Sequence, residues 1–112
     1  MIIETEEVRG VVVFSMEGEL DALTSFDLSR EFRKYAEQDV AKFVFDLDKL
    51  DYINSSGLGT LIALLKRVRS QKGDIKLANL RPHILDLFEL TKFNHIFEIY
   101  DSRERALEGF SE

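Results

Sequence analysis

The sequence contains no cysteine. A disulfide scaffold, a thiolate zinc site and a cysteine nucleophile are therefore all excluded. The sequence also has no run of lysine and arginine, and its net charge is -6. Nucleic acids and anionic membranes bind through excess positive charge, so both are disfavoured as partners.

Long apolar segments are missing as well. No stretch approaches the length of a membrane span. Residues 1–7 (MIIETEE) contain acidic side chains, whereas a signal peptide begins with basic side chains. We therefore expect a cytoplasmic protein. Its 112 residues, of which 45% are hydrophobic, suffice for one core but not for two. We expect a single domain over residues 1–112, with residues 111–112 as a short free tail.

Alternating and continuous apolar runs predict five strands. They lie over residues 2–8, 11–17, 42–47, 74–78 and 96–100. Arg9 and Gly10 separate the first two runs and predict a hairpin, and Gly18 is expected to end the second strand. Residues 48–53 are expected to form a loop.

Apolar residues at helical spacing predict four helices between and after these strands. The first is expected to begin with Thr24 as its N-cap, and its apolar face is Leu28, Phe32, Tyr35 and Ala36. The second carries Leu58, Leu61, Ile62, Leu65 and Val68 and stops before Gly73. The third runs from Pro82 to near Leu90 and turns Ile84, Leu85, Phe88 and Thr91 inward. The last begins at a capping box of Asp101 and Glu104 and presents Ala106, Leu107 and Phe110.

The resulting order is ββαβαβαβα. Alternating strands and helices imply an α/β domain with parallel strand pairs, and the leading hairpin makes the sheet mixed.

Residues with catalytic or ligand-binding potential are sparse. The histidines, His83 and His95, lack metal-ligand spacing, so we expect neither a metal site nor a cofactor. Three carboxylates, Asp46, Asp48 and Asp51, are interpreted as a solvated strand end rather than a cation site. The five phenylalanines Phe43, Phe45, Phe88, Phe93 and Phe97 are interpreted as core.

Residues 51–61 (DYINSSGLGTL) form the stretch with the clearest chemical potential. Polar residues that can cap a helix precede two glycines and a strong apolar pattern. Gly57 and Gly59 permit close backbone approach, but the Walker lysine and the third glycine of a dinucleotide loop are missing. The same stretch lacks the Gly-x-Ser-x-Gly pattern of a hydrolase. Its hydroxyls are therefore either helix caps or acceptors for phosphorylation, since a phosphate is stabilised at a helix N-terminus.

Residues 54–59 (NSSGLG) resemble the Asp-Ser-Ser/Thr-Gly-Leu-Gly motif of STAS domains, the anti-sigma factor antagonist family of bacteria. Further segments resemble landmarks of this family in the same order: residues 18–21, 45–47, 77–80, 90–91 and 96–101. The resemblance implies a mixed sheet with helices. It also implies a partner-binding surface made of Asp21, Asn54, Ser55, Ser56, Gly57, Leu58 and Gly59.

The resemblance further implies that the chain is not an enzyme but a switched binding partner. Ser55 matches the serine that an ATP-dependent anti-sigma factor kinase phosphorylates in this family. A PP2C-type phosphatase removes the phosphate again. Ser56 matches the second hydroxyl of the motif, which is a helix cap or a supporting group. The unphosphorylated form, expected to be a monomer when free, binds the anti-sigma factor and so releases a sigma factor.

One residue departs from the family motif, because Asn54 replaces the usual Asp. The change keeps the capping geometry and removes a negative charge beside the acceptor. The change either makes it easier to accommodate a phosphate or weakens recognition by a kinase that contacts the Asp carboxylate of the family motif. A STAS scaffold that is never phosphorylated is the alternative, and a nucleotide-binding protein is a third hypothesis that rests on the two glycines alone.

Overall fold

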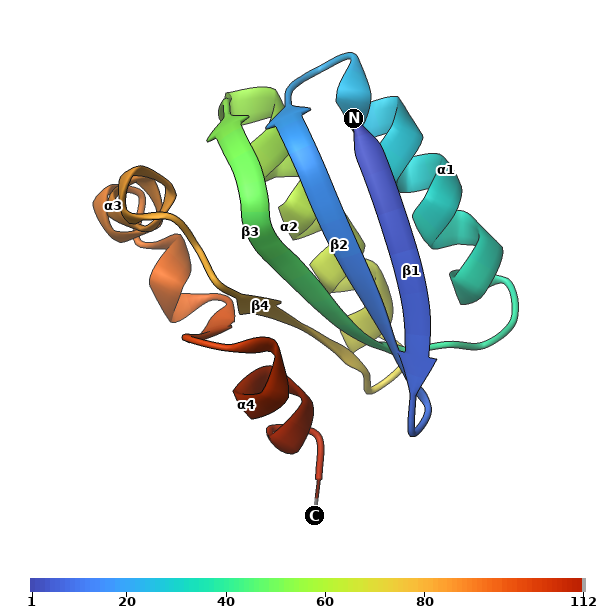
Figure 1. Ribbon diagram of the computed structural model, residues 1–112. Coiled ribbons are helices and arrows are strands. Elements are labelled where there is room, and N and C mark those ends of the chain that lie inside the picture. Colours follow the sequence, from blue (N-terminus) through green and yellow to red (C-terminus); the bar gives the residue numbers. More distant parts are fainter. Residues whose placement is uncertain (112) are drawn as a thin grey trace.

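The fold is an α/β sandwich built on one five-stranded mixed sheet (Figure 1). The computed structural model describes residues 1–111. Its elements in chain order are β1 (Ile2–Val8), β2 (Val11–Leu20), α1 (Thr24–Ala36), β3 (Lys42–Ile53), α2 (Ser55–Arg69), β4 (Asp74–Ala78), α3 (Pro82–Leu90), the 3-10 turn η1 (Phe93–His95), β5 (Glu98–Tyr100) and α4 (Arg103–Glu108). The predicted order ββαβαβαβα is confirmed.

The strands lie in the order β1-β2-β3-β4-β5, with β1 antiparallel to β2 and the remaining neighbours parallel. Val8 pairs with Val11, so the hairpin loop is the two residues Arg9 and Gly10. Both have positive φ, 51° and 81°, as a tight hairpin turn of this twist requires. The leading hairpin is therefore confirmed.

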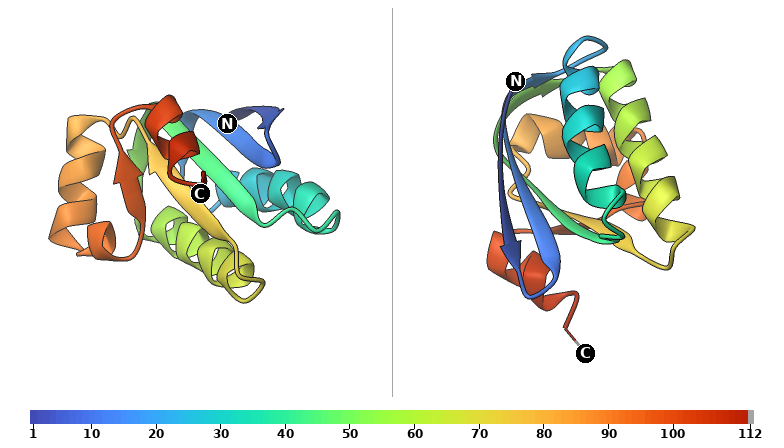
Figure 2. Two further views of the ribbon diagram at one scale, coloured as in Figure 1. Left: turned by 90° about the horizontal axis from the view of Figure 1, so that it is seen from below. Right: turned by 90° about the vertical axis from the view of Figure 1, so that its right-hand side faces the viewer.

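The two faces of the sheet are covered unequally. Helices α1 and α2 pack side by side on one face, and α4 covers part of the other (Figures 1 and 2). The larger core lies beneath α1 and α2 and also takes Ile84 and Phe88 from α3. A smaller cluster beneath α4 contains Val13, Val44 and Ala106. Within residues 1–111, no helix is long and apolar enough to span a membrane.

The predicted apolar stripes of α1 and α2 are confirmed. Leu28, Phe32 and Ala36 are buried in α1 with Tyr35 half-buried, and the predicted stripe of α2 faces the same core. Pro82 is the first residue of α3, as predicted. Of the four residues expected to face inward from α3, Ile84 and Phe88 are buried in the core, whereas Leu85 is only half-buried and lies outside it. Thr91 is exposed, and its hydroxyl donates to the carbonyl of Leu87 at 2.8 Å.

Two strands run further than predicted. Gly18 does not end β2, since the strand continues to Leu20. Gly18 lies within the strand at φ 116°, next to a shift in the register with β3. Residues 48–53 are not a loop but the second half of β3. They pair with the end of β2, where Leu20 lies opposite Ile53. This extension carries β3 to the same edge of the sheet as β2, where α2 begins.

The C-terminal elements are shorter than predicted. Residues Phe93–His95 form a 3-10 turn, and β5 covers only Glu98–Tyr100. The prediction of a capping box that begins at Asp101 is wrong. Ser102 is the N-cap of α4, and its hydroxyl accepts from the N–H of Arg105 at 3.1 Å. In the expected tail, Ser111 donates its N–H to Glu108 at 2.9 Å, and Glu112 lies outside the described residues.

Asp46 is not part of a solvated strand end. It is 8% exposed and lies at the centre of a polar network. Its carboxylate accepts from the Nε of Arg103 and from the side-chain amide of Asn79, both at 3.1 Å. Arg103 also donates to Glu6 at 2.6 Å and to Ser15, so the network joins α4 to β1, β2, β3 and the end of β4.

We predict that Asp46→Ala lowers the free energy of unfolding by about 2 kcal/mol, because Arg103 and Asn79 lose their partly buried acceptor. The matched control is Asp48→Ala, since Asp48 is exposed on the same strand. It should change the free energy by less than about 0.5 kcal/mol. Urea unfolding measures both, and equal effects would contradict the proposed importance of the network.

Candidate functional site

Asn54 is the N-cap of α2 and joins this helix to the end of β2. Its backbone is extended (φ -109°), and its side-chain oxygen accepts from the N–H of Gly57 at 3.0 Å. Its carbonyl accepts from Leu58 at 2.9 Å, and its N–H donates to the carbonyl of Leu20 at 3.2 Å. The first turn of α2 is thus fixed directly against β2 by one residue.

The two glycines of this turn have different roles. A Cβ on Gly57 would lie 2.5 Å from the carbonyl oxygen of Leu20 and 2.9 Å from Ile53, so only glycine fits there. A Cβ on Gly59 would have no neighbour within 4 Å. Gly57 therefore allows an internal approach of helix to strand, whereas Gly59 leaves an open position on the surface.

Ser55 and Ser56 are the first two residues of α2, and both are exposed. The capping role predicted as one possibility for Ser56 belongs to Asn54. Within residues 1–111, neither hydroxyl has a hydrogen-bond partner, although the carbonyl of Ser56 accepts from Thr60 at 3.1 Å. Both hydroxyls are accessible beside backbone N–H groups of a helix N-terminus, where an anion is stabilised.

Asp21, not Thr24, caps the start of α1. The Asp21 carboxylate accepts from the N–H groups of Leu23 and Thr24, each at 3.0 Å. The Thr24 hydroxyl instead donates to the carbonyl of Glu19 at 2.7 Å. The N–H of Thr24 is the main cause that lowers the pKa of Asp21, and the Thr24 hydroxyl and the N–H of Leu23 act in the same direction.

Three apolar side chains at this end of the molecule are exposed and were not predicted. Leu23 is 77% exposed, Phe26 67% and Tyr52 48%. Phe26 precedes Leu28 by two residues, which places it on the opposite side of α1 from the core stripe. The helical spacing alone could therefore have predicted that Phe26 faces away from the core and is available for another contact.

The starts of α1 and α2 meet at the carboxyl ends of β2 and β3 (Figure 1). We call this surface the Ser55 face. It comprises Asp21, Leu23, Phe26, Tyr52, Ser55, Ser56 and Gly59. Leu58 was predicted among the partner-binding residues, but its side chain is 6% exposed and lies in the core. The face combines apolar contact area with two free hydroxyls.

The described residues show no arrangement suited to metal binding. Within residues 1–111, no group of three or more His, Cys, Asp or Glu side chains is placed to hold an ion. His83 lies on α3 with its Nε2 2.6 Å from the carbonyl oxygen of Asp51, and Arg81 pairs with the carboxylate of Asp51. Both side chains therefore brace α3 against β3.

Comparison with known proteins places this geometry in a family. Residues 3–106 match the STAS domain. The chain belongs to the STAS domain family. Among relatives of this STAS domain, the anti-sigma F factor antagonist of Paenibacillus polymyxa is 32% identical over 107 residues, which cover 94% of this chain and 91% of the relative.

Solved STAS structures share the fold. A protein of Thermotoga maritima superposes with a TM-score of 0.93 at 22% identity, covering 98% of this chain and 95% of the other. The anti-sigma factor antagonist SpoIIAA in its unphosphorylated form gives 0.82 at 20% identity, with 96% and 95% covered. Its phosphorylated form gives 0.75 at 19% identity, with 96% and 98% covered.

We predict opposite effects of alanine at the two glycines of α2. Gly57→Ala should lower the free energy of unfolding by about 1–3 kcal/mol, because its methyl group overlaps the Leu20 carbonyl. Gly59→Ala should leave it unchanged or raise it by up to about 1 kcal/mol, because alanine favours the helix. Urea unfolding of the two variants measures this, and a destabilised Gly59→Ala would contradict the open position.

We predict that the Asp21 carboxyl titrates at lower pH in the folded chain than in the urea-unfolded chain. Because folding lowers this pKa, Asp21 stabilises the fold above its unfolded pKa. That contribution is lost as the pH falls through the folded pKa. NMR titration of the side-chain carboxyl carbon in both states measures the two midpoints. Equal midpoints would show that the bonds to Leu23 and Thr24 do not form in solution.

Proposed function

We propose that this STAS domain is an anti-sigma factor antagonist that binds its partner through the Ser55 face and is released by phosphorylation of Ser55. The observation that carries the proposal is the exposed Ser55 hydroxyl at the N-terminus of α2, free of hydrogen bonds within residues 1–111. The relatives named as anti-sigma factor antagonists support the choice of partner.

The position of Ser55 favours a switch that acts on binding rather than on folding. A phosphate adds about -1.5 to -2 charges at neutral pH. At the first position of α2 it lies near the positive end of the helix, which stabilises it. Asn54 already caps the helix, so a modified Ser55 leaves the cap bonds in place. The docking surface changes charge while the fold persists.

The apolar part of the Ser55 face accounts for affinity in the unphosphorylated form. Leu23 and Phe26 are exposed at the start of α1. The first turns of α1 and α2 lie side by side (Figure 2, right). Aromatic and aliphatic side chains of this kind supply the central contacts of protein interfaces. A dianion placed beside them must be desolvated when a partner docks, which opposes binding.

In this proposal the chain supplies the acceptor and the partner supplies the chemistry. The anti-sigma factor is itself the ATP-dependent serine kinase, and a PP2C-type phosphatase removes the phosphate. The chain acts in the cytoplasm, without a cofactor and as a monomer when free. It has no catalytic role of its own.

A second candidate function rests on Asn54. Where the family motif has Asp, this chain has a neutral cap beside Ser55. A kinase that reads the acid would not modify it, and the domain would then be a constitutive STAS scaffold of a signalling or transport assembly. Intact mass of the chain isolated from its native cell separates the two functions. A phosphorylated fraction favours the switch, and its absence under all growth conditions favours the scaffold.

We predict that Ser55→Asp weakens binding to the anti-sigma factor by about tenfold or more, because a charge enters the apolar docking surface. Its free energy of unfolding should stay within about 0.5 kcal/mol of the wild type. Calorimetric titration with the anti-sigma factor captured by the wild-type chain measures the binding.

Ser55→Ala should bind the same partner but accept no phosphate when the partner and ATP are added. Ser56→Ala is the matched control and should still gain one phosphate. Phosphate transfer to Ser56 in place of Ser55, or equal binding by Ser55→Asp and wild type, would contradict the proposed switch.

A further inference from the structure

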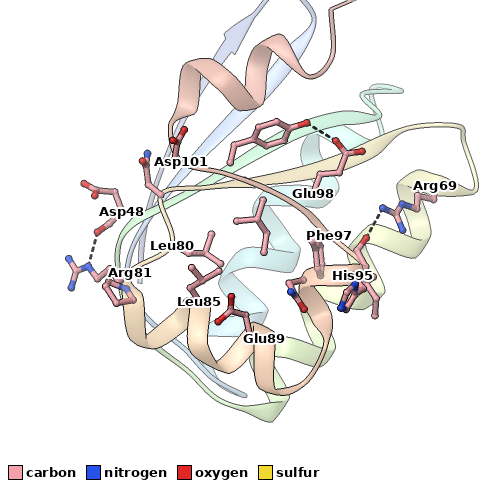
Figure 3. Close-up of a pocket in the computed structure, with 16 residues that line it drawn as sticks. Asp48, Arg69, Leu80, Arg81, Leu85, Glu89, His95, Phe97, Glu98 and Asp101 are labelled. Atoms are coloured by element: carbon pink, nitrogen blue, oxygen red, sulfur yellow. Dashed lines mark hydrogen bonds between the residues drawn. The ribbon is translucent and has the colours of Figure 1, made fainter.

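An open groove of about 1240 Å³ lies between α3 and β5, and none of its lining residues belongs to the Ser55 face (Figure 3). Its lining includes the apolar residues Leu80, Leu85, Phe97 and Ile99, which we call the apolar floor. Typical pockets for small ligands have about 300–1,000 Å³. The groove is larger and follows residues 94–101 along the chain, which suits an extended segment better than a compact molecule.

The backbone of β5 is available on the side of the groove. β5 is the last strand in the sheet order and pairs only with β4 among the described strands. The carbonyl of Tyr100 accepts from the N–H of Asn79 at 3.1 Å, so the backbone of Tyr100 faces β4. Backbone groups alternate in direction along a strand, and those of Ile99 therefore face away from β4. Figure 2 (left) shows α3 beyond this edge of the sheet.

The groove carries unbalanced negative charge on its rim. Arg69 pairs with Asp74 at 3.2 Å, and Arg81 pairs with Asp51, so both cations of the rim are already neutralised. Within residues 1–111, Glu89 and Asp48 have no such partner, and both are exposed. A segment with basic side chains would complement these two carboxylates.

We propose that the α3–β5 groove binds an extended segment of a partner protein, which adds to β5 as a sixth strand. Main-chain bonds to Ile99 supply affinity, and the apolar floor takes alternate side chains. Basic residues of the segment face Glu89 and Asp48. The proposal is independent of Ser55 and its modification.

The occupant is a partner protein rather than a second copy of this chain. The other free edge of the sheet is β1, whose sequence IIETEEV carries Glu4, Glu6 and Glu7. Docking this strand beside Glu89 and Asp48 places like charges together, which opposes self-association through the two edges.

The test is an NMR titration of the full ¹⁵N-labelled chain with an acetylated, amidated heptapeptide of alternating lysine and valine. We expect saturable shifts confined to α3 and residues 96–101, with the N–H of Ile99 becoming protected from hydrogen exchange. A peptide with alternate backbone N–H groups methylated should bind at least fivefold more weakly, because it lacks donors for strand pairing. The glutamate analogue of the peptide should not bind.

Glu89→Lys should weaken binding of the lysine–valine peptide at least fivefold. Glu108→Lys makes the same charge change on α4, outside the groove, and should alter affinity less than twofold. No saturable shift at millimolar peptide would overturn the proposal, as would shifts outside the groove. If the methylated peptide bound as tightly as the unmethylated one, strand addition would be overturned. If sedimentation showed a dimer of the chain that the peptide dissociates, the groove would be assigned to a second copy of the chain.

Discussion

The site depends on one close contact, between the carbonyl of Leu20 at the end of β2 and the first turn of α2. This oxygen accepts the N–H of Asn54 and leaves no room for a side chain on Gly57. The contact requires β3 to run parallel to β2 as far as Ile53, since only then does the chain arrive at Leu20. It therefore fixes where α2 begins and which of its residues face outward.

Because of this contact, the residue that caps α2 is not one of the residues with exposed hydroxyls. Asn54 uses its N–H, its carbonyl and its side chain within the fold, and each has a partner. Ser55 and Ser56 follow on the outer side of the turn and have no structural bond to lose through their hydroxyls. An Asp at the position of Asn54 could accept the same bond from Gly57, so the departure from the family motif alters charge and not architecture.

Hydrophobic periodicity predicted the order of the elements and the stripes of α1 and α2, and the turn residues Arg9 and Gly10 predicted the hairpin. Capping residues predicted that α2 begins near Ser55, because all of these signals are local in sequence. The second half of β3 was missed for a physical reason. Two register shifts against β2 give β3 extra residues, so its buried side chains Leu47, Leu50 and Ile53 recur every three residues instead of every two. The buried role of Asp46 depends on Arg103, 57 residues later in the chain, and no local pattern reveals such a partner.

The Ser55 face and the α3–β5 groove differ in the physics of recognition that they offer. The first presents exposed side chains at the carboxyl ends of strands. The second presents the free edge of β5 with an acidic rim. Coupling between them would require an element with two alternative arrangements. The β3–β4 ladder between them is continuous from Lys42 to Asp46, and Asp46 ties β3 to Asn79 beyond β4. The two surfaces share no residue, but Asp51 lies next to Tyr52 of the Ser55 face and contacts Arg81 and His83 at the start of α3. Any influence of Ser55 on the groove would therefore have to pass through the end of β3 and these contacts.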